Sequence, residues 1–490
     1  MELGVGGSNP PCCTKIMSKE KNLKPSKELP LGFVDRQEQE LLIRDFIISN
    51  IKEVMIKYGF QYLETPSFEF TDSIGKFLPD KERPDEGIFS FKDEKKWLSL
   101  RYDLTAPLAR YVAKNYLEIP KPFKRYQLGR VWRNEKPGPG RFREFLQFDA
   151  DYVGTKNLQA DAELCILLAD TLQKCGLDKN EFVIKVSNRK CFFGLLDWLK
   201  ITNEKQRIAI TRAVDKYDRI GIEGVASLLG KGRKDKSGDF TKGVDLNKKQ
   251  IEDITEYIKD NSFYDDERDN LKGGARFAPL GKWDDLSPLY IEGIKELGEI
   301  FAYTELSEFK DQIVYSPTLV RGIEYYTGTI FEVNLLFKVK NQKGQEIEFG
   351  SVGGGGRYDN LIKRFGNLDV PCTGVSFGID RLVFALMQKK DFEIKVVRPV
   401  VICVFDKSMN KKYVGILNKL RMSNISSEIY PGEGKLKKQM EYANKIGSPA
   451  VILYGDDEIK AGKAILKNLK SGKETSVAIE SLSDEIRKLL

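Results

Sequence analysis

Four arginine residues stand where a guanidinium group could meet a ligand. Each lies near glycine, proline or an aromatic residue, and glycine lets the backbone approach a bound molecule closely. A guanidinium group stays charged at working pH, binds phosphate through two parallel hydrogen bonds and stacks on flat rings. Together, such groups could hold a nucleoside triphosphate and neutralise charge that develops at phosphorus. The four are Arg133, Arg141, Arg321 and Arg381.

The absence of histidine narrows the chemistry further. The chain of 490 residues contains none, which excludes imidazole catalysis and histidine-ligated metals. Its 7 cysteines include no CxxC pair, so we predict neither a zinc site nor a disulfide framework. Any reaction must therefore use arginine, lysine, carboxylates, hydroxyls, backbone amides and bound ions.

Other interpretations of these features stay open. Any one of the arginines, taken alone, fits a surface salt bridge better than a ligand contact. Glycines beside Arg321, Arg357 and Arg381 argue against that alternative. The run Gly353–Gly356 resembles a phosphate loop, but the Lys-Ser/Thr pair of a Walker motif does not follow it. We interpret the run as tight strand packing.

Composition fits a globular enzyme rather than a disordered chain. Hydrophobic residues make up 41% and charged residues 31%. The net charge of +8 allows a polyanionic partner but fits a solvated surface equally well. No apolar run is long enough to span a bilayer, and the N-terminus lacks the pattern of a signal peptide. We therefore expect a cytoplasmic protein without a membrane partner.

Residues 1–16 differ from the rest. The stretch Gly7–Pro11 can be back-translated into the T arm of a transfer-RNA gene. We hypothesise that translation starts at Met17, and an ordinary flexible leader is the alternative. A native N-terminal peptide that contains Ser8 would contradict the hypothesis.

Hydrophobic periodicity predicts the elements that must position the arginines. A helix is expected from Leu42 to Tyr58, with Gly59 as its stop and a strand over 60–66. Further along, the pattern predicts a hairpin over 89–100, helices over 104–117 and 158–172, and a strand–loop–strand unit over 126–153. Its loop at 136–141 carries two prolines and two glycines, which exclude a helix there.

The second half of the chain changes character twice. Residues 187–310 are Lys-rich with mostly helical periodicity, which predicts a separate subdomain or insertion. Strands at 313–320 and 329–339 follow, with a polar turn at 341–344 and a helix from Asp380. From about residue 397, apolar strands at 400–405 and 450–454 alternate with helical segments and predict a small α/β domain.

These segments together resemble the histidyl-tRNA synthetase family, over almost the whole chain from about Leu31 to Leu490. Residues 31–35 with 58–66 look like the first class II motif, which builds the dimer interface in the family. Residues 123–148 look like the second motif and 377–381 like the third. Two further segments point to histidine, at 321–326 and 356–359.

The resemblance implies an α+β fold. It is a class II synthetase antiparallel-sheet catalytic core with a mostly helical insertion and a C-terminal α/β anticodon-binding domain. The expected domains are the leader 1–16, a catalytic core in two parts at 17–186 and 311–394, the insertion at 187–310, and the anticodon-binding domain at 395–490. The insertion is expected to meet the acceptor stem.

The same resemblance implies how ATP would be held. Arg133 is expected to contact the α-phosphate and the carboxylate of the amino acid. Arg141 should reach the terminal phosphates. Glu135 and Phe145 should hold the adenine, with Arg381 on its other face. ATP would arrive with Mg²⁺ as a substrate complex, and no tightly bound protein metal is expected.

For histidine, the resemblance implies two groups of contacts besides Arg133 and Arg321. One group should bind the α-amino group and the other should surround the imidazole. The first comprises Asp103, Thr105 and Gln147, and the second Asp151, Tyr325 and Tyr326. A buried carboxylate with two tyrosines suits a ring with one donor and one acceptor nitrogen.

The implied reaction is the activation of histidine with ATP and its transfer to tRNA(His), by a homodimer. The histidine carboxylate is already ionised, so its attack on the α-phosphate needs no general base. Arg321, across the phosphate from Arg133, would be the electrophilic catalyst. Two alternatives remain. One is a silent paralogue that regulates ATP phosphoribosyltransferase, and the other is an RNA-binding sensor. The lack of histidine codons would let the protein be made during histidine starvation, or it reflects drift.

Overall fold

The computed structural model describes residues 26–75, 87–138, 140–234, 238–259, 287–320, 326–340, 344–366, 368–389 and 391–490. The chain divides into two units between Glu393 and Ile394. Each unit has its own sheet and its own buried core.

An eight-stranded sheet forms the centre of the first unit, in the order β1-β5-β6-β13-β12-β11-β7-β10. The inner pairs are antiparallel, and only the outer pairs β1–β5 and β7–β10 are parallel. This confirms the expected α+β class with an antiparallel core. In sheet order the strands are Gln61–Tyr62, Phe123–Trp132, Glu144–Val153, Cys372–Gly378, Glu346–Arg357, Thr329–Lys340, Phe182–Asn188 and Ile313–Tyr315.

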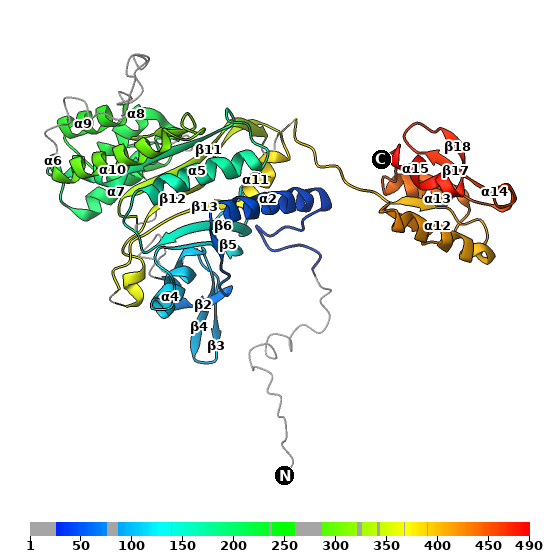
Figure 1. The fold of residues 1–490 in the computed structure, drawn as a ribbon. Coiled ribbons are helices and arrows are strands. Elements are labelled where there is room, and N and C mark those ends of the chain that lie inside the picture. Colours follow the sequence, from blue (N-terminus) through cyan, green and yellow to red (C-terminus); the bar gives the residue numbers. More distant parts are fainter. Residues whose placement is uncertain are drawn as a thin grey trace, which may run out of the picture. The chain divides into compact units, whose positions relative to one another are not determined.

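Three helices pack together beside this sheet (Figure 1). Helix α5 (Gln159–Lys174) contacts β13, α11 (Ile379–Leu386) contacts β6, and α2 (Glu38–Lys57) packs on both helices. The buried side chains of α2 recur at helical spacing, as the sequence predicted. Gly59 follows the helix with φ 73°, a left-handed conformation that glycine adopts without strain.

A smaller sheet in the order β2-β4-β3 lies next along the chain. Its strands are Phe68–Phe70, Lys96–Leu100 and Ser90–Asp93. The expected hairpin is confirmed, since β3 pairs with β4 across a turn that contains Glu94 at φ 49°. The helices α3 (Thr71–Gly75) and α4 (Thr105–Asn115) and the 3₁₀ turn η4 (Ile362–Phe365) complete this region.

The described part of the region between β7 and β10 is mostly helical, as its periodicity predicted. A two-stranded hairpin, β8–β9, occupies the polar stretch that had no predicted structure. The helices are α6 (Arg189–Trp198), α7 (Glu204–Val214), α8 (Tyr217–Leu229), α9 (Lys248–Lys259) and α10 (Pro288–Thr304), and the strands are β8 (Gly232–Lys234) and β9 (Phe240–Lys242).

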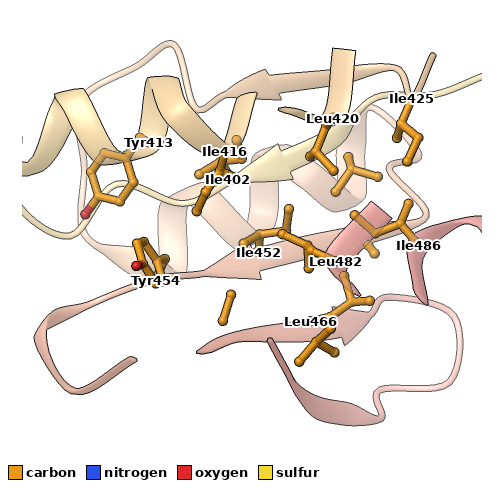
Figure 2. Close-up of a cluster of buried hydrophobic side chains, with 14 residues drawn as sticks. Ile402, Tyr413, Ile416, Leu420, Ile425, Ile452, Tyr454, Leu466, Leu482 and Ile486 are labelled. Carbon is orange, nitrogen blue, oxygen red and sulfur yellow. The ribbon is translucent and has the colours of Figure 1, made fainter. Parts of the chain in front are cut away.

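The second unit is a five-stranded sheet in the order β15-β14-β16-β17-β18 with helices packed on it. Side chains of α12, α15 and four strands form one apolar cluster (Figure 2). The strands are β14 (Val400–Ile402), β15 (Ser427–Ile429), β16 (Ala450–Leu453), β17 (Lys463–Asn468) and β18 (Glu474–Ala478). The helices are α12 (Asn410–Met422), α13 (Leu436–Lys445), α14 (Asp456–Ala461) and α15 (Leu482–Arg487).

A lysine-rich segment of this unit is a strand and not a helix. Its charges would also fit a solvated helix face, but residues 463–470 form strand β17 and the turn after it. Ala464 and Leu466 of β17 point into the core with period two, while Lys463 at the start of the strand stays exposed. That alternation is the signature of a strand with one buried face.

Candidate active site

One face of β6 carries three polar side chains at alternate positions. Gln147, Asp149 and Asp151 point to the same side because successive side chains of a strand alternate. Their partners across the ladder on β13 are small, namely Gly378, Ser376 and Gly374. Small partners leave open space above the polar row.

That space is a cavity of about 540 Å³. Ten of the predicted site residues line it, from both halves of the first unit: Asp103, Thr105, Arg133, Glu135, Arg141, Phe145, Gln147, Asp151, Tyr326 and Arg381. The other two, Arg321 and Tyr325, lie outside the described residues. The fold therefore gathers every described residue of the prediction around one hollow.

Glycines of β12 complete the cavity wall. Gly353, Gly354 and Gly355 line it and pair with β11 on one side and β13 on the other. A Cβ at Gly353 or Gly355 would overlap atoms of β13. The interpretation of this run as tight strand packing is thus confirmed, and the run also borders the cavity.

Arg133 is held over the cavity by three kinds of contact. Its Nε donates to the Tyr102 carbonyl at 3.2 Å, and its Nη2 donates to Gln147 Oε1 at 3.2 Å. The guanidinium carbon lies 4.5 Å from the ring centroid of Tyr102 and 5.1 Å from that of Phe145. These contacts hold the guanidinium group through Nε and Nη2. They leave Nη1 available to a ligand.

A second arginine is fixed from the other side. The Arg381 guanidinium lies 4.4 Å from the Phe349 ring centroid, and its Nη2 donates to the Phe349 carbonyl at 3.0 Å. The Phe349 ring stacks in turn on Phe384, with 5.8 Å between centroids and 12° between planes. Sequence analysis did not identify Phe349, because its contact with Arg381 crosses from β12 to α11.

The loop between β5 and β6 brings Arg141 to the cavity. Gly138 and Arg141 pair across a narrow turn, and Gly140 between them has φ 62°. A Cβ at Gly140 would lie 3.3 Å from the Phe349 ring. Two constraints therefore favour glycine here, the backbone angle and the close ring.

Asp103 has a structural contact besides its place in the cavity wall. Its Oδ1 accepts from the backbone N–H groups of Thr105, at 3.2 Å, and Ala106, at 3.0 Å. These bonds occupy one carboxylate oxygen at the start of α4 and lower the pKa, while burial raises it more strongly. Oδ2 is the oxygen left for a ligand.

Asp151 has a partner near each of its carboxylate oxygens. Tyr358 donates its hydroxyl hydrogen to Oδ1, and Arg125 Nη2 lies 3.0 Å from Oδ2. Among the described residues, however, no donor makes a hydrogen bond to Oδ2, although that atom is buried. Burial raises the pKa of Asp151, and Arg125 and the Tyr358 hydroxyl lower it.

Asp149 is a cavity residue that sequence analysis missed. It accepts from Gln147 Nε2 at 2.9 Å and from Thr105 Oγ1 at 3.4 Å. Burial and the neighbouring Asp151 raise the pKa of Asp149 to about 7. The alternation from Gln147 through Asp149 to Asp151 was the available signal, since it places all three on one face.

Arg357 lies in a predicted histidine-specific segment but turns away from the cavity. It forms a buried ion pair with Asp161 on α5 and donates to the Thr155 carbonyl at 3.0 Å. Its neighbour Tyr358 lines the cavity instead and contacts Asp151. Within this segment, the residue that lines the cavity is the tyrosine.

The described residues contain neither a metal-binding cluster nor a membrane-spanning helix. No group of three or more Cys, Asp or Glu side chains is arranged to hold a metal ion. None of the described helices combines the length and apolarity that a membrane span requires.

Comparison with known proteins decides the family. The family model of histidyl-tRNA synthetase matches residues 32–382, and that of an anticodon-binding domain matches residues 399–489. The chain belongs to the histidyl-tRNA synthetase family. Within this family, the histidine–tRNA ligase of Brucella suis is 45% identical over 468 residues, covering 94% of this chain and 92% of the relative. That of Bartonella bacilliformis is 45% identical over 474 residues, covering 95% and 93%.

Solved structures show the same fold. The crystal structure of histidyl-tRNA synthetase from a Nostoc species has a TM-score of 0.70 and 25% identity, covering 95% of this chain and 100% of that one. A Bacillus halodurans protein described as an ATP phosphoribosyltransferase regulatory subunit/histidyl-tRNA synthetase has a TM-score of 0.63 and 20% identity, covering 86% and 97%. The second likeness concerns the fold alone.

Proposed function

We propose that the chain is a histidine–tRNA ligase. It activates histidine with ATP to histidyl-adenylate and pyrophosphate, and then transfers histidine to the terminal ribose of tRNA(His). Mg²⁺ enters with ATP as part of the substrate. Membership of the family and the 45% identity to curated ligases over most of the chain support this function.

The observation that carries the proposal is the pairing of two kinds of contact in one cavity. Arg133, Arg141 and Arg381 supply fixed positive charge, and Asp149 and Asp151 supply buried carboxylates. Phosphate binds the first kind, and a ligand with ammonium and N–H donors binds the second. An amino acid and ATP could thus meet with the carboxylate in line with the α-phosphate.

Each residue then has a chemical role. Arg133 bridges the histidine carboxylate and the α-phosphate, and Arg321 neutralises the developing phosphorane from the other side. Arg141 holds the terminal phosphates. Phe145 and Arg381 enclose the adenine, and Glu135 accepts its amino hydrogens. Tyr102, whose hydroxyl donates to Glu135 Oε1, orients that carboxylate.

Selection of histidine would come from Asp151. Its Oδ2 has an open lone pair among the described residues, and an imidazole N–H is a donor of the right kind. Tyr325 and Tyr326 would complete the ring contacts. Asp103, Thr105 and Gln147 would bind the α-amino group. Amino acids without a ring N–H would leave a buried oxygen unpaired, which penalises them.

The second unit would bind the anticodon loop, where the anticodon-binding family model matches. Lys463 and Lys470 are exposed on and after β17, and could meet RNA phosphates. The expected domain boundaries, including the insertion at 187–310 on the acceptor stem, remain proposals. The cytoplasm is the compartment we propose.

We also propose a homodimer. The sheet β2-β4-β3 presents Phe68, Phe70 and Phe91, with exposed fractions of 50%, 45% and 44%. They share a face, since Phe70 and Phe91 both pair with Leu98, and the rings of Phe68 and Phe91 lie 5.5 Å apart. An apolar face of this kind is typical of a subunit interface. Equilibrium sedimentation should give about twice the chain mass, and a monomer would contradict this.

The alternative is a silent regulatory paralogue. Two features favour the ligase, namely the second family match at residues 399–489 and the retention of Arg133, Arg141 and Arg381 around the cavity. Pyrophosphate–ATP exchange with each of the twenty amino acids separates the two. We expect exchange with histidine alone, abolished by Arg321→Ala in folded protein. Folded wild-type protein that exchanges with no amino acid would favour the paralogue.

A further inference from the structure

Arg125 on β5 stands directly across the ladder from Asp151 on β6. It is among the largest fully buried side chains, with no exposed surface. It does not line the cavity itself. Burying a guanidinium group away from solvent costs desolvation free energy, so the position of Arg125 needs a structural or functional explanation.

The contacts of Arg125 are few for so costly a group. Nη2 lies 3.0 Å from Asp151 Oδ2 and donates to the Leu104 carbonyl at 3.2 Å. Nε and Nη1 have no hydrogen-bond partner among the described residues. A group placed for stability alone would have its donors satisfied. Within the described part of the chain, its one ion pair is with Asp151, a carboxylate that lines the cavity.

We propose that Arg125 is a positioning residue for histidine recognition, which fixes the charge and direction of the Asp151 carboxylate from the neighbouring strand. This deepens the proposed function and rests on it. The amino acid never touches Arg125. It meets Oδ2 of Asp151. Arg125 on the neighbouring strand sets the position of that oxygen, and Tyr358 holds the other carboxylate oxygen, Oδ1.

The surroundings of Asp151 show why one cation matters. The titratable groups near it are Asp103 before α4, Asp149 on the same strand, and Tyr358 and Cys372, besides Arg125. Burial keeps the pKa of the Tyr358 hydroxyl and the Cys372 thiol well above their usual values, so both stay neutral. Arg125 is then the one cation among these groups, and it lowers the pKa of both Asp149 and Asp151.

Arg125 should therefore affect the binding of histidine and not the binding of ATP. Arg125 lowers the pKa of Asp151 and so favours the ionised carboxylate, which accepts the ring N–H. Without it, the buried carboxyl would hold a proton to higher pH and present a donor to a donor. Histidine affinity would fall most at low pH, while the ATP contacts, which come from other residues, would be unchanged.

The test measures pyrophosphate–ATP exchange by the full chain between about pH 6 and pH 9. We expect Arg125→Met to raise KM for histidine about tenfold or more at pH 7, equivalent to one unit of pKa. KM for ATP should change by less than about twofold. The pH at which kcat/KM for histidine rises should move upward. Arg125→Lys, which keeps the charge, should restore most of the affinity.

Arg110→Met is the matched control. Arg110 forms a two-bond ion pair with Glu69 at 2.7 and 2.9 Å, away from the cavity. Its loss should affect stability but not KM for histidine or its pH profile. An Arg125→Met protein that folds and keeps the wild-type histidine KM and pH profile would overturn the proposal. Wild-type protein without histidine exchange would instead overturn the proposed function.

If Arg125→Met does not fold, a double-mutant cycle still decides. Asp151→Asn removes the carboxylate charge, so Arg125→Lys should change the histidine KM less in that background than in wild type. Equal fold-changes in both backgrounds would mean that Arg125 acts by a route other than Asp151, and would overturn the proposal.

Discussion

Gly374 and Asp151 face each other across β13 and β6, and a Cβ at Gly374 would overlap Asp151 Oδ1. The glycine therefore makes room for the carboxylate. Since Tyr358 donates to the same oxygen, a side chain at position 374 would displace both partners of that hydrogen bond.

Gly374→Ala should raise KM for histidine by about tenfold or more, with little change in KM for ATP, because it moves the carboxylate and not the arginines. Histidine-dependent pyrophosphate exchange measures both constants. Gly298→Ala on α10 is the control, since a Cβ there meets nothing within 4 Å. Equal histidine KM in both variants would show that Asp151 does not need this space.

Asp149 should give the reaction a pH dependence near neutrality. Its pKa is raised to about 7, so it becomes an anion, suited to an ammonium group, only as pH rises past that value. We expect kcat/KM for histidine to rise between pH 6 and 8, a span of about two units, and to rise less in Asp149→Asn. Parallel profiles for the two proteins would contradict the assignment.

The same shift predicts the sign of a stability change. The pKa of Asp149 is higher in the folded protein than the ordinary value of 3.8, so folding binds a proton between these limits. Its contribution to stability is present at pH 4 and is lost as pH rises through about 7. Urea unfolding should show wild type losing on the order of 3 kcal/mol relative to Asp149→Asn over this window. A loss in the opposite direction would contradict it.

Phe349 should support ATP binding through Arg381. Replacing it with leucine removes the ring under the guanidinium, and we expect KM for ATP to rise roughly threefold to tenfold. KM for histidine should stay within about twofold. Phe193→Leu is a matched control, because Phe193 carries the guanidinium of Arg189 at 4.7 Å from its centroid but lies in α6. A similar ATP effect in both variants would point to a general loss of packing.

Arg357 should matter for stability. Arg357→Met leaves Asp161 buried without its ionic partner, and we expect the free energy of unfolding to fall by about 3 kcal/mol or more. Urea denaturation at neutral pH measures this. Adding Asp161→Asn should recover part of the loss, because the unpaired charge is then gone. No recovery would mean that the guanidinium acts through the Thr155 carbonyl instead.

Local patterns predicted most of the elements and the cavity wall. The stop at Gly59, the hairpin turn at Glu94 and the strands around the Arg141 loop all follow from residues close in sequence. A resemblance in motifs then selected ten cavity residues without a structure. These are cases in which a short stretch of chain carries the whole signal.

What escaped prediction depends on pairing between distant strands. Nothing in the local sequence distinguishes Arg125 from other arginines in strands. Its role follows only from the strand pairing that places it opposite Asp151. Tyr358 and Phe349 likewise gain meaning only from neighbours on β6 and α11. The lysines of β17 carry no signal of their own, because charges at short intervals fit a helix and a strand equally well. Register, rather than composition, was the missing information.

The strand order has a consequence for synthesis of the protein. β5 and β6 form a hairpin. The other neighbour of β6 in the sheet is β13, which follows roughly 200 residues later in the chain. While the ribosome makes the intervening segment, β6 has an open edge and Asp151 lacks its later partners. An unpaired edge of this kind attracts other strands. Free histidine cannot stabilise the nascent chain at this stage, because its proposed pocket forms only after Gly374 has left the ribosome.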